Sequence, residues 1–190
     1  MKQLPENKIL PIQKLVACFN NTATPYKYYW LLSIIEALES RIDLGSTMIP
    51  KKELFARMVS NAWYTVNYFH ISFGKQDNLQ IAIENIKRIE KLTIDAKKTD
   101  ILGRLLTTDN ISTIQQLNHF DNNVPHWFLS PWLPGKDKQT IYKLSSYFTY
   151  RCPYALHKQF ISVDLLWANY FFENAALIKD FCYWNLVLFL

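Results

Sequence analysis

Two acidic residues and a lysine have the order used by some metal-dependent nucleases. Asp77 precedes Asp95-Ala96-Lys97, which matches the acid…acid-x-Lys order that binds a divalent cation and positions a water molecule. That chemistry needs the second acid and the lysine on a strand beside the first acid, whereas residues 94–98 are typical of a polar helix end. The pattern is also short, and Glu6-Asn7-Lys8 repeats it. A divalent-metal nuclease that uses Asp77, Asp95 and Lys97 is therefore the weakest of three hypotheses.

The histidines and cysteines form no recognisable catalytic or metal-binding motif. No two histidines share the i, i+4 spacing of a zinc metalloprotease helix, and no cysteine pair has the CxxC spacing. Cys152 and His157 are the nearest pair, but Pro153 lies between them. We therefore predict no catalytic residue, no metal ligand, no cofactor and no small-molecule ligand. The residues considered are His70, His119, His126, His157, Cys18, Cys152 and Cys182.

The elements that would position these residues are predicted to be helices. From Pro25 onward, Tyr26, Trp30, Ile34, Leu38 and Ile42 recur at helical spacing until Gly45, and such spacing predicts one buried face. The aromatic and basic run of residues 26–30 is therefore expected to pack in the core rather than stack on bases. Similar patterns predict helices over residues 9–20, 50–64, 76–94, 99–107, 110–119, 138–149 and 162–190, the last as one or two helices.

Two stretches do not read as regular helices. Residues 65–73 contain side chains that favour strands, but the stretch is short. We interpret it as a loop or a distorted helix. Residues 124–135 hold Pro125, Pro131 and Pro134 among tryptophan and phenylalanine. Prolines at this spacing prevent a continuous helix, so we predict an ordered, packed Pro/aromatic loop.

Composition indicates one domain over residues 1–190, of the all-α class. Hydrophobic residues make up 49% of the chain and aromatic residues 15%, while only 4 glycines are present. Such a chain can bury a large core, but it lacks the glycines of all-β folds with many tight turns or of glycine-rich phosphate loops. The net charge of +5 is spread thinly along the chain, so it does not by itself indicate DNA binding.

The cellular setting follows from three simpler features of the sequence. The cysteine count is odd, which favours a reducing compartment. The amino terminus lacks the long apolar stretch of a signal peptide, and no run reaches the roughly 20 apolar residues that span a bilayer. A cytoplasmic protein with no membrane contact is therefore expected. The chain also stops inside the apolar pattern of residues 184–190, without the usual helix-end signals. Either this last helix is buried across the domain or the chain is cut from a longer protein, and we expect the second.

Several strings resemble the amino-terminal region of a Bacteroidetes-type bacterial family, the HNH endonuclease domain-containing proteins. They keep their order over most of the chain. The strings are Leu10-Pro11-Ile12-Gln13-Lys14-Leu15, residues 21–30, residues 62–69, residues 72–77, residues 124–132 and the closing Trp184-Asn185-Leu186. In that family the HNH motif lies beyond the point where this chain stops, so the resemblance assigns no catalytic residue here.

The resemblance implies a non-catalytic helical module that precedes a DNA-cutting domain and helps to engage DNA or to assemble the protein. A role in defence or restriction follows by analogy only. If DNA binds, Lys75, Arg104 and Arg151 are the expected phosphate contacts, because each is a basic residue beside a predicted loop. The alternative is a protein-interaction or dimerisation module, which would form a homo-oligomer and have no role on nucleic acid.

Overall fold

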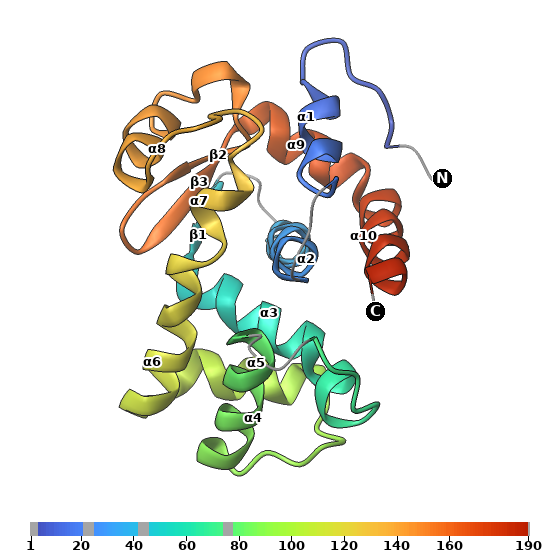
Figure 1. Cartoon of the computed structure of the whole chain (residues 1–190), viewed down its shortest axis with the longest axis vertical. Coiled ribbons are helices and arrows are strands. Elements are labelled where there is room, and N and C mark those ends of the chain that lie inside the picture. The colour runs from blue at the N-terminus through green and yellow to red at the C-terminus, as the bar shows by residue number, and fades with distance from the viewer. Residues whose placement is uncertain (1–3, 21–24, 42–45, 74–77, 190) are drawn as a thin grey trace.

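The apolar patterns of the sequence form helices close to the predicted ranges. The computed structural model describes residues 4–20, 25–41, 46–73 and 78–189 and shows a mostly helical fold with a small sheet (Figure 1). The α-helices are α1 (Ile12–Ala17), α2 (Tyr26–Glu39), α3 (Lys51–Asn67), α4 (Asn78–Glu90), α5 (Lys98–Thr107), α6 (Ile111–His119), α7 (Pro125–Phe128), α8 (Lys138–Ser145), α9 (Leu165–Glu173) and α10 (Ala175–Phe189). Two short 3₁₀ helices are η1 (Phe120–Asn122) and η2 (Thr149–Arg151).

Helix α2 lies in the centre of the molecule, and Figure 1 looks nearly along its axis. Most of its side chains are buried on every side of the helix, including Tyr28, Tyr29 and Trp30, which confirms the prediction that residues 26–30 pack in the core. Helix α3 packs on one side of α2, and α9 and α10 pack on another. A helix that is hydrophobic all round is stable in water only when other elements cover it.

The α3–α6 segment forms a separate helical layer below α2 in Figure 1. Helix α3 contacts α4, α5 and α6, and α4 packs against α6. Helix α6 begins as the sequence predicts, because the Asn110 side chain accepts hydrogen bonds from the backbone N–H groups of Ser112 and Thr113, the usual role of an N-cap asparagine.

A small antiparallel sheet corrects the prediction of an all-α fold. The strands β1 (Met48–Pro50), β2 (Tyr154–Leu156) and β3 (Phe160–Val163) pair in the order β1-β3-β2. Ile49 pairs with Ile161, and Leu156 pairs with Ile161 on its other side. Strands of three or four residues are too short to show a clear alternation in sequence, and all three side chains of β2 are buried. The sequences of these strands therefore show neither a helical nor a strand-like hydrophobic period.

The Pro/aromatic stretch of residues 124–135 is packed as predicted, but it begins with the single helical turn of α7. Pro125 occupies the first position of this turn, where proline is well tolerated. Phe128, Leu129, Trp132 and Leu133 are buried. The segment thus fills the space between η1 and α8 with side chains of the main core.

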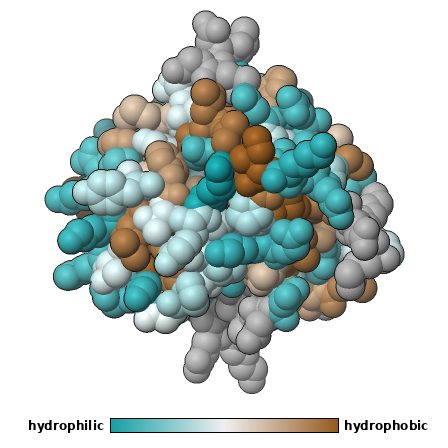
Figure 2. Space-filling view, turned by 90° about the horizontal axis from the view of Figure 1, so that it is seen from above, coloured by the Kyte–Doolittle hydropathy of each residue, from teal (hydrophilic) through white to brown (hydrophobic). Residues whose placement is uncertain are grey.

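The surface is mixed. On the face seen from above, hydrophobic patches alternate with hydrophilic side chains (Figure 2). Within the part of the chain that the structure describes, each helix is too short or too polar to cross a membrane.

Candidate functional site

A pocket of about 540 Å³ opens where helix α3 begins. The turn between β2 and β3 lies on one side of it, and the α6–η1 segment lies on the other. Several of its wall residues are lysines, and one is a carboxylate. The lining residues are Pro50, Lys51, Lys52, Phe55, Asn118, Asp121, Lys158 and Gln159.

Lys51 is the buried cation of this pocket, with only 3% of its surface exposed. Its backbone N–H donates to the Gln159 carbonyl at 2.8 Å, which fixes the start of α3 against the β2–β3 turn. Its ammonium donates to Asp121 Oδ1 and to the Tyr142 hydroxyl, both at 2.6 Å. Burial lowers the pKa of Lys51, although the hydrogen bond and charge of Asp121 act against that shift.

Lys51, Asp121 and Tyr142 form a polar cluster, and Asp121 also contacts a second lysine, Lys138. Lys138 Nζ lies 3.5 Å from Asp121 Oδ2 and donates to Asn122 Oδ1 at 2.9 Å. Both ammonium groups lie near the Tyr142 ring, with Lys51 Nζ 4.9 Å and Lys138 Nζ 6.0 Å from its centroid. Burial raises the pKa of Tyr142, and the neighbouring Asp121 carboxylate raises it further. Tyr142 therefore stays a neutral hydroxyl at physiological pH.

His126 lies near Lys138, Asp121 and Lys51 and is 5% exposed. Burial lowers the pKa of His126, and the charge of Lys138 lowers it further, while a hydrogen bond to the Asp121 backbone opposes the shift. A lowered pKa keeps the imidazole neutral at pH 7. Within the described residues, its Nδ1 atom has no hydrogen-bond partner.

The cluster carries more positive than negative charge. Among the described residues that line or adjoin the pocket, Asp121 is the one carboxylate, and four are lysines: Lys51, Lys52, Lys138 and Lys158. Lys52 Nζ also donates to the carbonyls at the end of α5, at 2.9 and 3.2 Å. The N-cap of α3 is a proline whose side chain makes no capping bond, so the positive end of the helix dipole adds to the lysines. Such a surface favours an oxyanion such as phosphate.

The predicted DNA contacts do not line this pocket. Arg104 is exposed, and its guanidinium donates from Nε to Glu90 Oε2 at 2.6 Å. Arg151 is exposed at the end of η2, with a positive φ of 56°. Lys75 lies outside the described residues. Arg104 therefore has a structural partner, and the role of all three residues on DNA stays a prediction.

The acid-x-Lys segment lies in the turn between α4 and α5, not on a strand. Asp95 and Lys97 are exposed there, and Lys97 is the N-cap residue of α5. A hydrogen bond from the Thr93 side chain lowers the pKa of Asp95. Asp77 falls outside the described residues. Among described residues, no three histidine, cysteine or acidic side chains are grouped so that they could hold a metal ion.

The cysteines and the remaining histidines occupy unrelated places. All three cysteines are buried, and burial raises the pKa of Cys152 to about 12, which disfavours the reactive thiolate. His157 instead stacks on Phe160, with ring centroids 4.3 Å apart. His70 and His119 are exposed. The structure therefore does not join Cys152 and His157 into a nucleophile and base.

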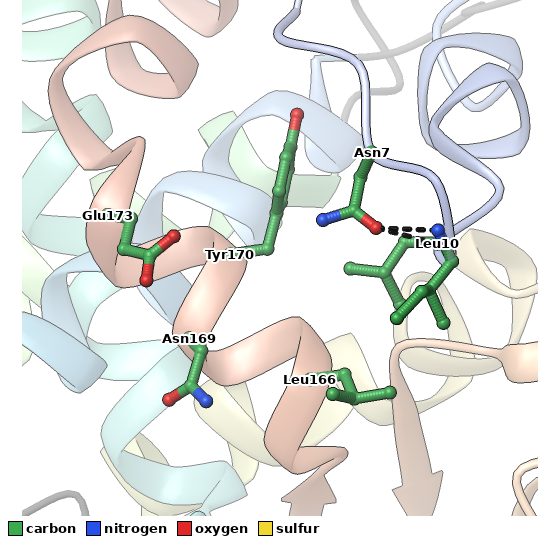
Figure 3. A pocket seen from close by; sticks show the side chains of 7 residues that line it. Asn7, Leu10, Leu166, Asn169, Tyr170 and Glu173 are labelled. Atoms are coloured by element: carbon green, nitrogen blue, oxygen red, sulfur yellow. Dashed lines mark hydrogen bonds between the residues drawn. The ribbon is translucent and has the colours of Figure 1, made fainter.

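A smaller hollow lies between the amino-terminal segment and α9 (Figure 3). Asn7 and Tyr170 face one another across it. Both are already engaged, because Asn7 Oδ1 accepts from the N–H groups of Ile9 and Leu10 at 2.9 Å, and Tyr170 donates to the Pro5 carbonyl at 2.7 Å. With a volume of about 120 Å³, this hollow is a small packing gap between the amino-terminal segment and α9.

Sequence reasoning missed the lysine-lined pocket because its residues share no local motif. Lys51 opens one helix, Asp121 belongs to η1 and Tyr142 belongs to α8. The one signal in the sequence is Lys51 itself, a lysine directly after Pro50 at the predicted start of a helix. No protein-family model, curated protein or solved structure matches this chain.

Proposed function

We propose that this chain is a non-catalytic helical module that engages DNA through the phosphate backbone, as part of an HNH-type DNA endonuclease. The observation that carries the proposal is the pocket at the start of α3, where Lys51, Lys52 and Lys158 line the wall. The resemblance of the strings in residues 10–186 supplies the nuclease setting. The pocket supplies a contact surface in addition to Lys75, Arg104 and Arg151, which stay predicted contacts.

The arrangement suits a phosphate backbone better than a base edge. Lysine acts as a point charge and is a common phosphate contact, whereas base recognition relies on bidentate arginine, asparagine or glutamine. Lys51 is held by Asp121 and Tyr142, so its position is fixed and its charge is balanced by Asp121. Lys158 is exposed and can reach a passing phosphate. Binding of this kind is independent of sequence and depends on salt.

Removing two of these charges will lower the salt dependence of DNA binding. The slope of log affinity against log salt is negative. In the Lys52→Gln/Lys158→Gln variant, we expect it to become shallower by about 2, one unit for each lost phosphate contact. Glutamine at position 52 retains a donor for the carbonyls at the end of α5. Fluorescence anisotropy of a labelled duplex, titrated at several salt concentrations, measures the slope.

The matched control is Lys8→Gln/Lys91→Gln, which removes the same charge from exposed positions outside the pocket. Its slope should match that of the unaltered protein. An equal fall in both variants would mean that only net charge matters, and the pocket would lose its role. Absence of duplex binding at low salt would remove the proposal itself.

A second candidate function is self-association, favoured by the outer face of α10. Leu177, Trp184, Val187 and Leu188 are 50%, 51%, 68% and 67% exposed. At about 100° per residue, their spacing places them within one side of the helix. An exposed apolar stripe of this kind is typical of a protein-interaction surface.

If this stripe joins two copies, Trp184→Ser/Leu188→Ser will weaken the dimer by about 2 kcal/mol or more, because buried tryptophans often dominate an interface. Sedimentation equilibrium over a range of concentrations gives the dimer constant. Tyr147→Ser/Tyr150→Ser, which alters two exposed aromatics elsewhere, should leave the constant unchanged. A protein that stays monomeric at every concentration would eliminate this candidate.

A further inference from the structure

A second pocket, of about 360 Å³, lies between the end of α3 and one face of α4. Its α4 residues are Glu84, Lys87 and Arg88, whose spacing of three and four places them on one side of the helix. The other wall comes from the last turn of α3 and the segment after it. The lining residues are Val66, Asn67, His70, Glu84, Lys87 and Arg88.

Asn67 is the unusual residue of this pocket. It is 1% exposed, and neither its Nδ2 nor its Oδ1 atom has a hydrogen-bond partner within the described structure. Burying an amide without partners is costly, and native proteins rarely leave both atoms unpaired. Because no hydrogen bond holds the side chain, rotating the amide toward the pocket would break none. A ligand group that offers a donor and an acceptor together would pair with both amide atoms.

The charges around Asn67 indicate a ligand that is also anionic. Lys87 and Arg88 are the cations, and Glu84 is the one carboxylate among the described lining residues. Glu84 already accepts a hydrogen bond from Gln80 Nε2 at 3.0 Å. Arg88 donates to Asn85 Oδ1 on its own helix, which holds the guanidinium at the edge of the pocket. Two neighbouring cations, one of them with a held guanidinium, suit a phosphate or carboxylate.

The backbone after α3 is strained where it enters the pocket. His70 has a φ of 53°, a left-handed conformation that is uncommon for residues other than glycine. The turn is held by hydrogen bonds from Phe69 N–H to the Tyr64 carbonyl at 2.9 Å and from Ile71 N–H to the Thr65 carbonyl at 3.0 Å. This turn places His70 on the pocket wall. Strain of this kind concentrates at ligand sites.

We infer that this pocket binds a nucleoside monophosphate, with the base edge at Asn67 and the phosphate at Lys87 and Arg88. The asparagine amide presents a donor beside an acceptor, the pattern that pairs with the edge of a nucleobase. The volume lies within the range of small-ligand sites. The ligand is a free nucleotide or the terminal nucleotide of a strand, since both offer the same chemistry. This inference does not rest on the pocket at the start of α3.

Calorimetric titration of the whole chain with AMP, GMP, CMP and UMP tests the inference. We expect saturable binding of at least one nucleotide with a stoichiometry of one. Asn67→Leu keeps the size of the side chain and removes the amide, and it should weaken binding by roughly 5- to 100-fold, the range for one lost buried pairing. Its thermal unfolding temperature should stay the same or rise, because an unpaired amide is lost.

Two further measurements separate the base from the phosphate. Lys87→Gln/Arg88→Gln should weaken binding of the nucleotide, and Lys8→Gln/Lys143→Gln, which alters exposed residues outside the pocket, should not. Inorganic phosphate should bind more weakly than the nucleotide. Terminal-phosphate DNA strands and free nucleotides, compared at equal concentration, identify the source of the ligand.

Three results would overturn the inference: no saturable binding at about 10 mM nucleotide, unchanged binding in folded Asn67→Leu, or inorganic phosphate binding as tightly as every nucleotide. If Asn67→Leu does not fold, the Lys87/Arg88 variant decides the matter alone. Lys52→Gln/Lys158→Gln should retain nucleotide binding. The two pockets therefore succeed or fail separately.

Discussion

Replacing Trp30 with alanine will lower the free energy of unfolding by about 3–5 kcal/mol, the usual cost of removing a fully buried tryptophan. Trp30 is completely buried in the middle of α2. Its indole N–H donates to the Tyr154 hydroxyl at 2.9 Å, and that hydroxyl donates to the Pro125 carbonyl at 2.6 Å. The substitution therefore leaves a cavity and also breaks a hydrogen-bonded chain that joins α2, β2 and α7.

Two controls separate these effects. Tyr154→Phe retains the ring but leaves the Trp30 N–H and the Pro125 carbonyl unpaired, which should cost about 1–3 kcal/mol. Trp127→Ala removes a tryptophan that is 55% exposed, and it should change stability by about 0.5 kcal/mol or less. Urea denaturation followed by circular dichroism gives all three values. A loss of under about 1 kcal/mol for Trp30→Ala would contradict the central position of α2.

Replacing Glu90 with alanine will cost about 3 kcal/mol, because it leaves buried polar groups without their acceptor. The Glu90 carboxylate accepts from the Thr113 hydroxyl at 2.5 Å, the Thr108 hydroxyl at 2.7 Å and Arg104 Nε at 2.6 Å. This cluster ties the end of α4 to α5 and to the first turn of α6. Both threonines are buried, so water cannot replace the lost partner without a local opening.

The same residue gives a prediction on pH. Burial raises the pKa of Glu90, but the hydrogen bonds from Thr113, Thr108 and Arg104 outweigh burial and hold the pKa below its ordinary value of 4.5. A lowered pKa in the folded state adds stability above the unfolded value, and that stability is lost as pH falls through the folded value. The stability difference between the unaltered protein and Glu90→Gln should therefore be constant above pH 4.5 and shrink below it.

Denaturation of both proteins at a series of pH values measures this difference. Asp109→Asn, at an exposed residue near the same cluster, serves as the control for general acid effects. A Glu90→Gln curve that runs parallel to that of the unaltered protein down to the lowest pH would contradict the assignment.

The helices were predictable because their signals are local. Asn110 caps α6 from one residue before it, and Pro25 marks the start of α2. The sheet was not predictable, since β1 and β3 lie far apart in the sequence and have only three and four residues. The stretch of residues 65–73 shows the limit between the two cases. Helix α3 continues to Asn67 and then ends in a strained turn, which agrees with the interpretation as a loop or distorted helix.

The candidate sites were hidden for a different reason. Lys51, Asp121 and Tyr142 are polar residues on three elements, and only the packing of α3, η1 and α8 brings them together. Asn67 attracts attention through its burial and its lack of partners, and neither property is visible in a sequence. The predicted contacts Arg104 and Arg151 were chosen because they flank loops, a rule that does not take account of an acidic partner such as Glu90.

The complete enclosure of α2 has a consequence for synthesis on the ribosome. Residues 26–39 leave the ribosome well before α9 and α10, which cover one side of α2. Until these two helices are made, the tyrosine, tryptophan and leucine side chains on that side of α2 stay exposed. Chaperones that bind exposed apolar segments can recognise them. Helix α2 therefore reaches its final packing only after residues 165–189 have been synthesised.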